Sequence, residues 1–332
     1  MPESSTALST PYAEFDFTPG DLARLRFAFS PVSEAVASLR MLQDPGRHAL
    51  HLPWIRGVRP RLRAMDLRLL FALAPLGAYI PDFLTPPPTG PLPDIAAELD
   101  LVASADPDEA AREVARVPAA DTRPVQEFLA DPAAGTARAA AQLRQYWDTA
   151  LAPYWPQIQG LFESEVLRRS RQLTREGAAA MFNDLHENVR WDDGVLRVRT
   201  TAWRRDGPLC GDGMILVPSV FQWPDTLVMA EPYQPMLVYP APGVATVWQQ
   251  GTVPTPDALD ALIGRTRARI LVALTEPATT VILARRLSMT PGAVSQHLKV
   301  LHAGGLLTRN RSGREVFYGR SPLGHALCGR SC

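Results

Sequence analysis

The chain has 332 residues, with 34 basic and 34 acidic side chains, so it exceeds one typical domain and can bury substantial cores. Three cysteines do not make a disulfide framework, and the first residues lack the basic and apolar regions of a secretory signal. The longest apolar stretch, residues 69–80, is too short to span a bilayer. We therefore expect a cytoplasmic protein with no membrane partner.

The zero net charge conceals a division along the chain. Residues 257–332 carry 11 basic and 4 acidic side chains, a net charge of +7, which leaves −7 for residues 1–256. Such an asymmetry is typical of a nucleic-acid-binding part attached to a different domain. Pro254 and Pro256 stiffen the segment between the two parts. We expect an N-terminal domain over residues 11–252 and a C-terminal domain over residues 256–332.

The first two thirds of the N-terminal domain predict helices. Three helix starts are indicated by a capping residue directly before a proline, at Ser30, Asp106 and Asp131. The capping side chain accepts from the first turn, and proline suits the first helical position. Apolar side chains then recur at helical spacing. The expected helices cover residues 19–29, 31–43, 61–73, 92–104, 107–117, 122–130, 132–150, 157–174 and 175–185.

After residue 188 the pattern changes to strands. Asp193-Gly194 lies between two alternating runs and indicates a hairpin. Short apolar runs separated by Gly and Pro predict further strands over residues 214–218, 226–229, 235–239 and 245–248. Helices followed by strands, without βαβ alternation, favour an α+β domain with antiparallel strands over a parallel sheet.

Aromatic side chains suggest where this domain could hold a ligand. Aromatic-rich concave sites suit small apolar or aromatic molecules, and ordinary core packing explains the same residues. Binding of a small organic effector by this domain is therefore a hypothesis, with core packing as its alternative. Its candidate residues are Trp147, Trp155, Trp191, Phe221 and Trp223.

Residues 279–303 predict two helices joined by a tight turn. Thr290 is a good N-cap, and Pro291 follows at the first helical position. The second helix has a buried stripe at i, i+4 and i+7, formed by Val294, Leu298 and Leu301. Its other face has no carboxylate, so it can approach phosphate and base edges without repulsion.

The residues after this helix indicate a wing. Gly304 and Gly305 end the helix, and two short strands, residues 306–311 and 315–320, flank a turn at Gly313. Four arginines, Arg309, Arg311, Arg314 and Arg320, crowd this hairpin. A helix-turn-helix followed by such a hairpin is a winged helix, which docks on duplex DNA.

We assign DNA-contacting roles within this segment. Ser295 and Gln296 are expected to reach base edges, and Ala293 offers a methyl contact. His297 packs or bonds phosphate, and the remaining residues hold the backbone. The predicted set is Thr290, Ala293, Ser295, Gln296, His297, Lys299, Arg309, Arg311 and Arg314.

Residues 265–320 resemble the ArsR/SmtB family of bacterial winged-helix regulators, most clearly in Ser295-Gln296-His297-Leu298, Gly305-Leu306 and Arg311-Ser312-Gly313-Arg314. The resemblance implies a homodimeric transcriptional regulator, usually a repressor, that an effector releases from a double-stranded DNA operator. It also implies pairing through residues 256–274 and 322–330. Residues 216–224 resemble an uncharacterised domain found ahead of ArsR-type winged helices in high-GC bacteria.

The chain departs from this family at its metal site. Founding members bind metal through a cysteine pair on the second helix, whereas residues 279–283 contain no Cys, His or acidic residue. His325, Cys328 and Cys332 form an alternative ligand set at the C-terminal tail, where Cys also occurs as a small hydrophobe. We expect no metal and no cofactor.

An enzymatic function is not expected. Asp184, His186 and Glu187 form an Asp-x-His-Glu fragment without a second histidine motif nearby. The alternative to a DNA-binding regulator is a protein-interaction scaffold, or an unrecognised enzyme, that carries the winged helix as an interaction module.

Overall fold

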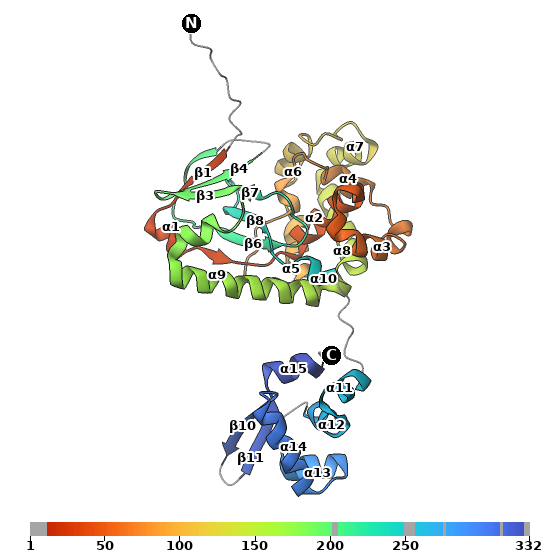
Figure 1. Cartoon of the computed structure of the whole chain (residues 1–332). Coiled ribbons are helices and arrows are strands. Elements are labelled where there is room, and N and C mark those ends of the chain that lie inside the picture. Colours follow the sequence, from red (N-terminus) through yellow and green to blue (C-terminus); the bar gives the residue numbers. More distant parts are fainter. Residues whose placement is uncertain (1–11, 201–204, 249–255, 275–276, 313–314, 329–332) are drawn as a thin grey trace. The chain divides into compact units, whose positions relative to one another are not determined.

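The computed structural model describes residues 12–200, 205–248, 256–274, 277–312 and 315–328. The chain divides into two compact units, Met1–Trp248 and Gln249–Cys332 (Figure 1). Among the helices of the described ranges, none combines the length and the apolar character that a membrane crossing needs.

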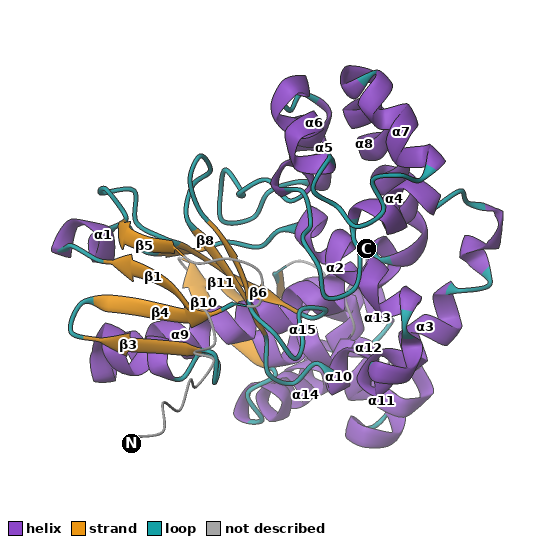
Figure 2. Cartoon of the chain, turned by 90° about the horizontal axis from the view of Figure 1, so that it is seen from above, coloured by secondary structure: helices purple, strands orange, loops and turns teal. Residues whose placement is uncertain are grey.

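Helices gather on one side of the N-terminal unit, and a long helix runs along its strands (Figures 1 and 2). The predicted helices over residues 31–43 and 132–150 are confirmed with those bounds. Asp131 Oδ1 accepts from the Ala134 amide at 3.0 Å, which explains where the second of these helices begins. The helices are α1 (Pro19–Ala23), α2 (Pro31–Gln43), α3 (Leu52–Val58), α4 (Arg68–Leu73), α5 (Ile95–Ala103), α6 (Pro107–Val114), α7 (Arg123–Ala130), α8 (Pro132–Ala150), α9 (Trp155–Asn183) and α10 (Ala245–Trp248).

Two four-stranded sheets complete this unit. One has the order β3-β4-β1-β5 and the other β2-β6-β8-β7. The strands are β1 (Tyr12–Asp16), β2 (Arg26–Phe27), β3 (Val189–Asp192), β4 (Val195–Arg199), β5 (Arg205–Pro208), β6 (Ile215–Ser219), β7 (Leu227–Met229) and β8 (Met236–Pro240). The predicted hairpin is the antiparallel pair β3–β4.

The sheets include antiparallel pairs as predicted, such as β1–β4, β3–β4 and β7–β8, but differ from the prediction of helices followed by antiparallel strands in two respects. β1 and β2 precede most of the helices, and the pairs β1–β5, β2–β6 and β6–β8 are parallel. The connection from β2 to β6 runs through helices α2 to α9 and strands β3 to β5, and such a long crossover allows β2 and β6 to point the same way. The unit is therefore α+β with mixed sheets.

Three local predictions also change. Residues 19–29 contain α1 and then β2, because the chain leaves the helix at Arg24 and pairs with β6. Residues 61–73 are split into a short 3₁₀ turn and α4. Residues 245–248 form helix α10, because Val244, Val247 and Trp248 have helical spacing and are buried in the helical core.

A glycine allows α7 and α8 to pack closely. A methyl group at Gly135 of α8 would lie 2.6 Å from Cδ2 of Phe128, a fully buried ring of α7. We expect Gly135→Ala to lower the free energy of unfolding by about 1–3 kcal/mol, because the ring or the helix must move. In α9, a methyl group at Gly160 would meet nothing within 4 Å, so Gly160→Ala should stabilise by about 0.5–1 kcal/mol. Urea unfolding of the two variants measures both changes in stability. Equal unfolding midpoints for Gly135→Ala and Gly160→Ala would contradict the close contact between Gly135 and Phe128.

The C-terminal unit is a winged helix. Its elements are α11 (Pro256–Ile263), α12 (Arg265–Ala273), β9 (Ala278–Thr279), α13 (Thr280–Leu287), α14 (Pro291–Ala303), β10 (Leu307–Ser312), β11 (Glu315–Arg320) and α15 (Pro322–Cys328). The antiparallel sheet has the order β10-β11-β9. Gly264, at φ 85°, separates α11 from α12 within residues 256–274, the first of the two segments that the resemblance implies for pairing. The predicted fold class, a helical and β N-terminal domain with a C-terminal winged helix-turn-helix, is confirmed.

Candidate nucleic-acid interface

The turn between α13 and α14 is fixed by backbone and capping bonds. Ser288 is left-handed at φ 55° and ends α13, and the Met289 amide donates to the Ala284 carbonyl at 2.9 Å. Thr290 Oγ1 accepts from the Ala293 amide at 3.3 Å, as an N-cap does. This short connection holds α14 at a defined angle to α13, which is the geometry of a helix-turn-helix.

Helix α14 has one buried and one exposed face. Val294, Leu298 and Leu301 are buried in the C-terminal core, as their spacing predicted. Gln296 and Lys299 are exposed on the other side. The apolar contacts therefore determine which way the polar face points, and that face is open to a partner.

The other predicted residues of α14 lie around this exposed face. Ala293, Ser295 and His297 are half-buried, so their side chains are partly accessible. Val300 was not predicted as a site residue, yet it is 48% exposed and follows Gln296 by one helical turn. An exposed valine there can contact a thymine methyl group. The i+4 spacing of Val300 from Gln296 could have indicated from the sequence that both lie on the exposed face.

The wing is a regular hairpin. Arg309 pairs with Tyr318 and Arg311 with Val316 across the two strands. Alternation along a strand places Arg309 and Arg311 on the same face, and both side chains are exposed. Arg314, at the predicted tip, lies outside the described residues.

Arg320 contacts helix α12 through its side chain. Its Nε donates to the Leu271 carbonyl at 2.7 Å and its Nη2 to the Val272 carbonyl at 2.6 Å. These are carbonyls in the last turn of α12, which a cation satisfies favourably. Arg320 therefore ties β11 to α12.

The electrostatics of this surface favour a polyanion. The sequence of α14 and β10 contains no Asp or Glu, and residues 257–332 carry a net charge of +7. Because exposed charges act over about a Debye length, roughly 8–10 Å, Lys299, Arg309 and Arg311 contribute to the attraction of phosphate.

The structure separates the aromatic residues predicted to bind an effector. Trp147 packs on Trp155, with ring centroids 4.9 Å apart, and both join the large helical core together with Phe221. Trp191 stacks on the ring of Phe182 in a second core cluster. Trp223 is 53% exposed. The five rings do not form one cluster.

The residues considered for metal binding and catalysis have other contacts. Asp184 Oδ2 accepts from Arg169 Nη1 at 2.8 Å, and His186 Nδ1 accepts from the Asn188 amide at 3.1 Å. Burial lowers the pKa of His186. On α15, His325 is exposed and Cys328 half-buried, whereas Cys332 lies outside the described residues. In the part of the chain that is described, no three His, Cys, Asp or Glu side chains group as metal ligands.

Two family comparisons match separate parts of the chain. Residues 108–245 match a family described as "Family of unknown function (DUF5937)", and residues 262–310 match one described as "Helix-turn-helix domain". Searches of curated proteins and of solved structures found no match. The second match runs from the end of α11 into β10, so it covers the turn and α14 described above.

Proposed function

We propose that the protein is a cytoplasmic, sequence-specific transcriptional regulator of the ArsR type that lacks the metal-binding cysteine pair. The observation that carries the proposal is the orientation of α14, whose apolar side faces the core and whose carboxylate-free side faces outward beside the wing arginines. A capped helix with this polarity, next to a cationic hairpin, fits the major groove and the adjacent backbone.

Each predicted contact residue, together with Val300, has a proposed role. Ser295 and Gln296 read base edges, with Ala293 and Val300 available for methyl contacts. The backbone contacts come from Thr290, His297, Lys299, Arg309, Arg311 and Arg314.

We propose that two copies pair and that the dimer represses transcription until an effector binds. Leu262 of α11 is 67% exposed and Leu323 of α15 is 53% exposed. A second copy would bury these apolar side chains, which lie in the segments that pair in the resembling family. A pair of α14 helices about 34–36 Å apart would then meet successive major grooves of a pseudo-palindromic site.

The test compares Gln296→Ala with Arg309→Ala on a selected DNA site and on point variants of that site. We expect Gln296→Ala to relax preference at one base position by about 1–3 kcal/mol. Arg309→Ala should weaken binding to all sequences alike and reduce the salt slope by about 1 per copy.

Binding titrations at several salt concentrations distinguish the two effects. If both variants lost selectivity equally, the assigned roles would be wrong. If the unmodified chain showed no salt-dependent retention on DNA, the alternative of a winged helix used for protein interaction would be favoured.

A further inference from the structure

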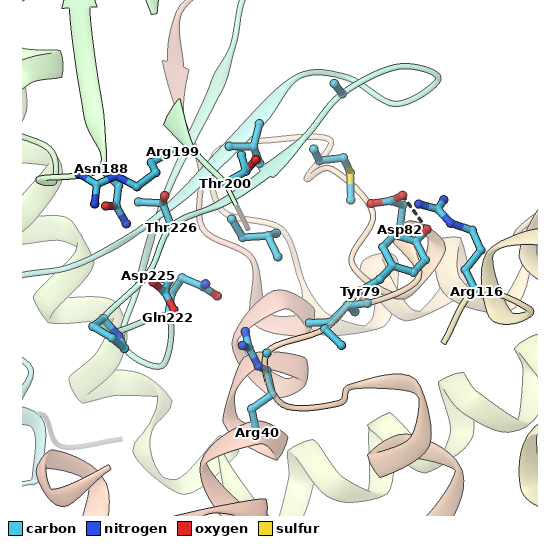
Figure 3. A pocket seen from close by; sticks show the side chains of 18 of the residues that line it. Arg40, Tyr79, Asp82, Arg116, Asn188, Arg199, Thr200, Gln222, Asp225 and Thr226 are labelled. Carbon is cyan, nitrogen blue, oxygen red and sulfur yellow. Dashed lines mark hydrogen bonds between the residues drawn. The ribbon is translucent and has the colours of Figure 1, made fainter. Parts of the chain in front are cut away.

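The N-terminal unit contains a cavity of about 880 Å³, within the usual size range of small-molecule sites. Its walls come from the end of α2, from the segment before α5, from the β3–β4 hairpin and from the segment around β7 (Figure 3). The aromatic side chains predicted to bind an effector are not the residues that line it; the lining surface is about equally polar and apolar.

Two polar atoms in the cavity wall lack partners. Arg40 Nε and Thr226 Oγ1 are buried and have no hydrogen-bond partner among the described residues. A buried donor left unpaired has lost its hydrogen bonds to water without replacement, which is unfavourable, most of all for a charged group. Such atoms are commonly paired by a ligand or by water, so the wall near Arg40 can accept a polar group.

At the other end of the cavity, the charged side chains already have partners. The Arg116 guanidinium lies 3.9 Å from the centre of the Tyr79 ring, and Tyr79 Oη donates to Asp82 Oδ2 at 2.9 Å. Figure 3 shows this group apart from Arg40. Of Arg40 and Arg116, Arg40 is therefore the one whose buried Nε still lacks a hydrogen-bond partner among the described residues.

The charges around the cavity limit which anion fits. Arg40, Arg116 and Arg199 line it together with four acids, Asp82, Glu187, Asp225 and Glu231. Burial lowers the pKa of Arg40, and the charge of Asp225 opposes this shift. With acids in slight excess, a multiply charged anion is repelled more strongly than a singly charged one, so a single negative charge is the better partner for Arg40.

Part of the cavity lining is apolar. Ile80, Leu227 and Met229 line the same cavity, and hydrocarbon buried against such side chains is stabilised by its removal from water. We propose that the cavity binds a small organic monocarboxylate, with its carboxylate on the Arg40 guanidinium and its hydrocarbon body on Ile80, Leu227 and Met229.

The cavity wall continues to the end of the N-terminal unit. Gln222 lines the cavity, and its neighbour Phe221 packs on Trp54 and Trp248 with ring centroids 4.8 and 5.6 Å away. Trp248 is the last residue of this unit. A ligand that moves the Gln222 segment therefore changes the contacts of the residue that leads toward the winged helix. This last step rests on the proposed function; the binding site itself does not.

The test uses the full chain with 3-phenylpropanoate and hexanoate as probes, with their neutral amides and inorganic phosphate alongside. We expect both carboxylates to raise the melting temperature and to titrate calorimetrically, and the amides and phosphate to do neither. Arg40→Met should weaken carboxylate binding about 10- to 100-fold, the loss of one charge-assisted contact. Thr226→Val, an isosteric change, should weaken it a few-fold.

Arg47→Met is the matched control, because Arg47 is exposed and pairs with Asp44 outside the cavity; it should leave binding unchanged. The proposal is overturned if no carboxylate binds, if the amides or phosphate bind as well, or if Arg40→Met and Thr226→Val both bind like Arg47→Met. Binding by the unmodified chain that needs Arg40 supports the site even if the protein fails to bind DNA, which would overturn only the proposed function. Unchanged DNA affinity in saturating carboxylate would overturn the coupling step.

Discussion

Replacing Arg169 with methionine is expected to lower the free energy of unfolding by about 3 kcal/mol, the lower end of the range for breaking a buried ion pair. Arg169 is 1% exposed. Its Nε donates to Glu165 Oε1 at 2.7 Å, and its Nη2 donates to the Asp184 carbonyl at 2.9 Å. Methionine would leave the buried Glu165 with Arg168 as its remaining cationic partner, so part of its charge would be uncompensated.

Urea unfolding of Arg169→Met and Arg168→Met provides the comparison. Arg168 is about half-exposed and contacts the same Glu165, so its loss should cost about 1 kcal/mol or less. The double variant Arg169→Met/Glu165→Leu should recover much of the stability, because both buried charges are gone. Equal costs for the two single variants would show that burial of Arg169 does not govern the effect.

The second large effect is a loss of stability as the pH rises. Glu34 and Glu98 are buried, and burial raises the pKa of each carboxyl from 4.5 to about 8. Glu34 Oε2 accepts from the Val220 amide at 3.0 Å, and Glu98 Oε2 accepts from the Val32 amide at 2.8 Å. These bonds oppose the shift but do not cancel it.

The direction follows from proton binding. Between pH 4.5 and about 8 the folded chain holds a proton on each carboxyl that the unfolded chain releases, so stability is fully present below pH 4.5 and falls until about pH 8. At 1.36 kcal/mol per pKa unit, the loss is on the order of several kcal/mol from each residue.

Unfolding titrations from pH 5 to pH 9 measure this loss. Glu34→Gln and Glu98→Gln should each flatten the decline, because an amide does not ionise, whereas Glu176→Gln on the exposed surface of α9 should leave it unchanged. A pH profile that neither core variant alters would mean that these carboxyls ionise as readily in the folded chain as in the unfolded one.

The winged helix could be predicted because its signals are local. Thr290, Pro291 and the stripe of Val294, Leu298 and Leu301 lie within 12 consecutive residues, and the cap and the helical period act within that span. The structure places these residues as the sequence indicated. The contacts of Arg320 with α12 could not be read in the same way, because they join residues 48 and 49 positions apart.

The N-terminal unit shows the limits of local signals. β2 was hidden in a predicted helix because its pairing partner, β6, lies almost 190 residues away. Trp248 belonged to a predicted strand, yet its burial against Trp54 and Phe221 favours a helical turn. Arg40 and Thr226 line the same cavity, although they are far apart in the sequence and no motif or spacing connects them. Most of the aromatic residues that were predicted to bind an effector are packed in the hydrophobic cores.

The most direct test of DNA binding is the salt dependence of the full chain on a duplex selected from random sequence. If two copies contact phosphate through Lys299, Arg309 and Arg311, log K should fall linearly with log salt concentration, with a slope of magnitude about 5 or more. The selected duplex should also bind at least about 1,000-fold more tightly than a scrambled duplex. Affinity that is independent of salt, or equal for the two duplexes, would contradict the assignment of α14 and the wing as a sequence-reading surface.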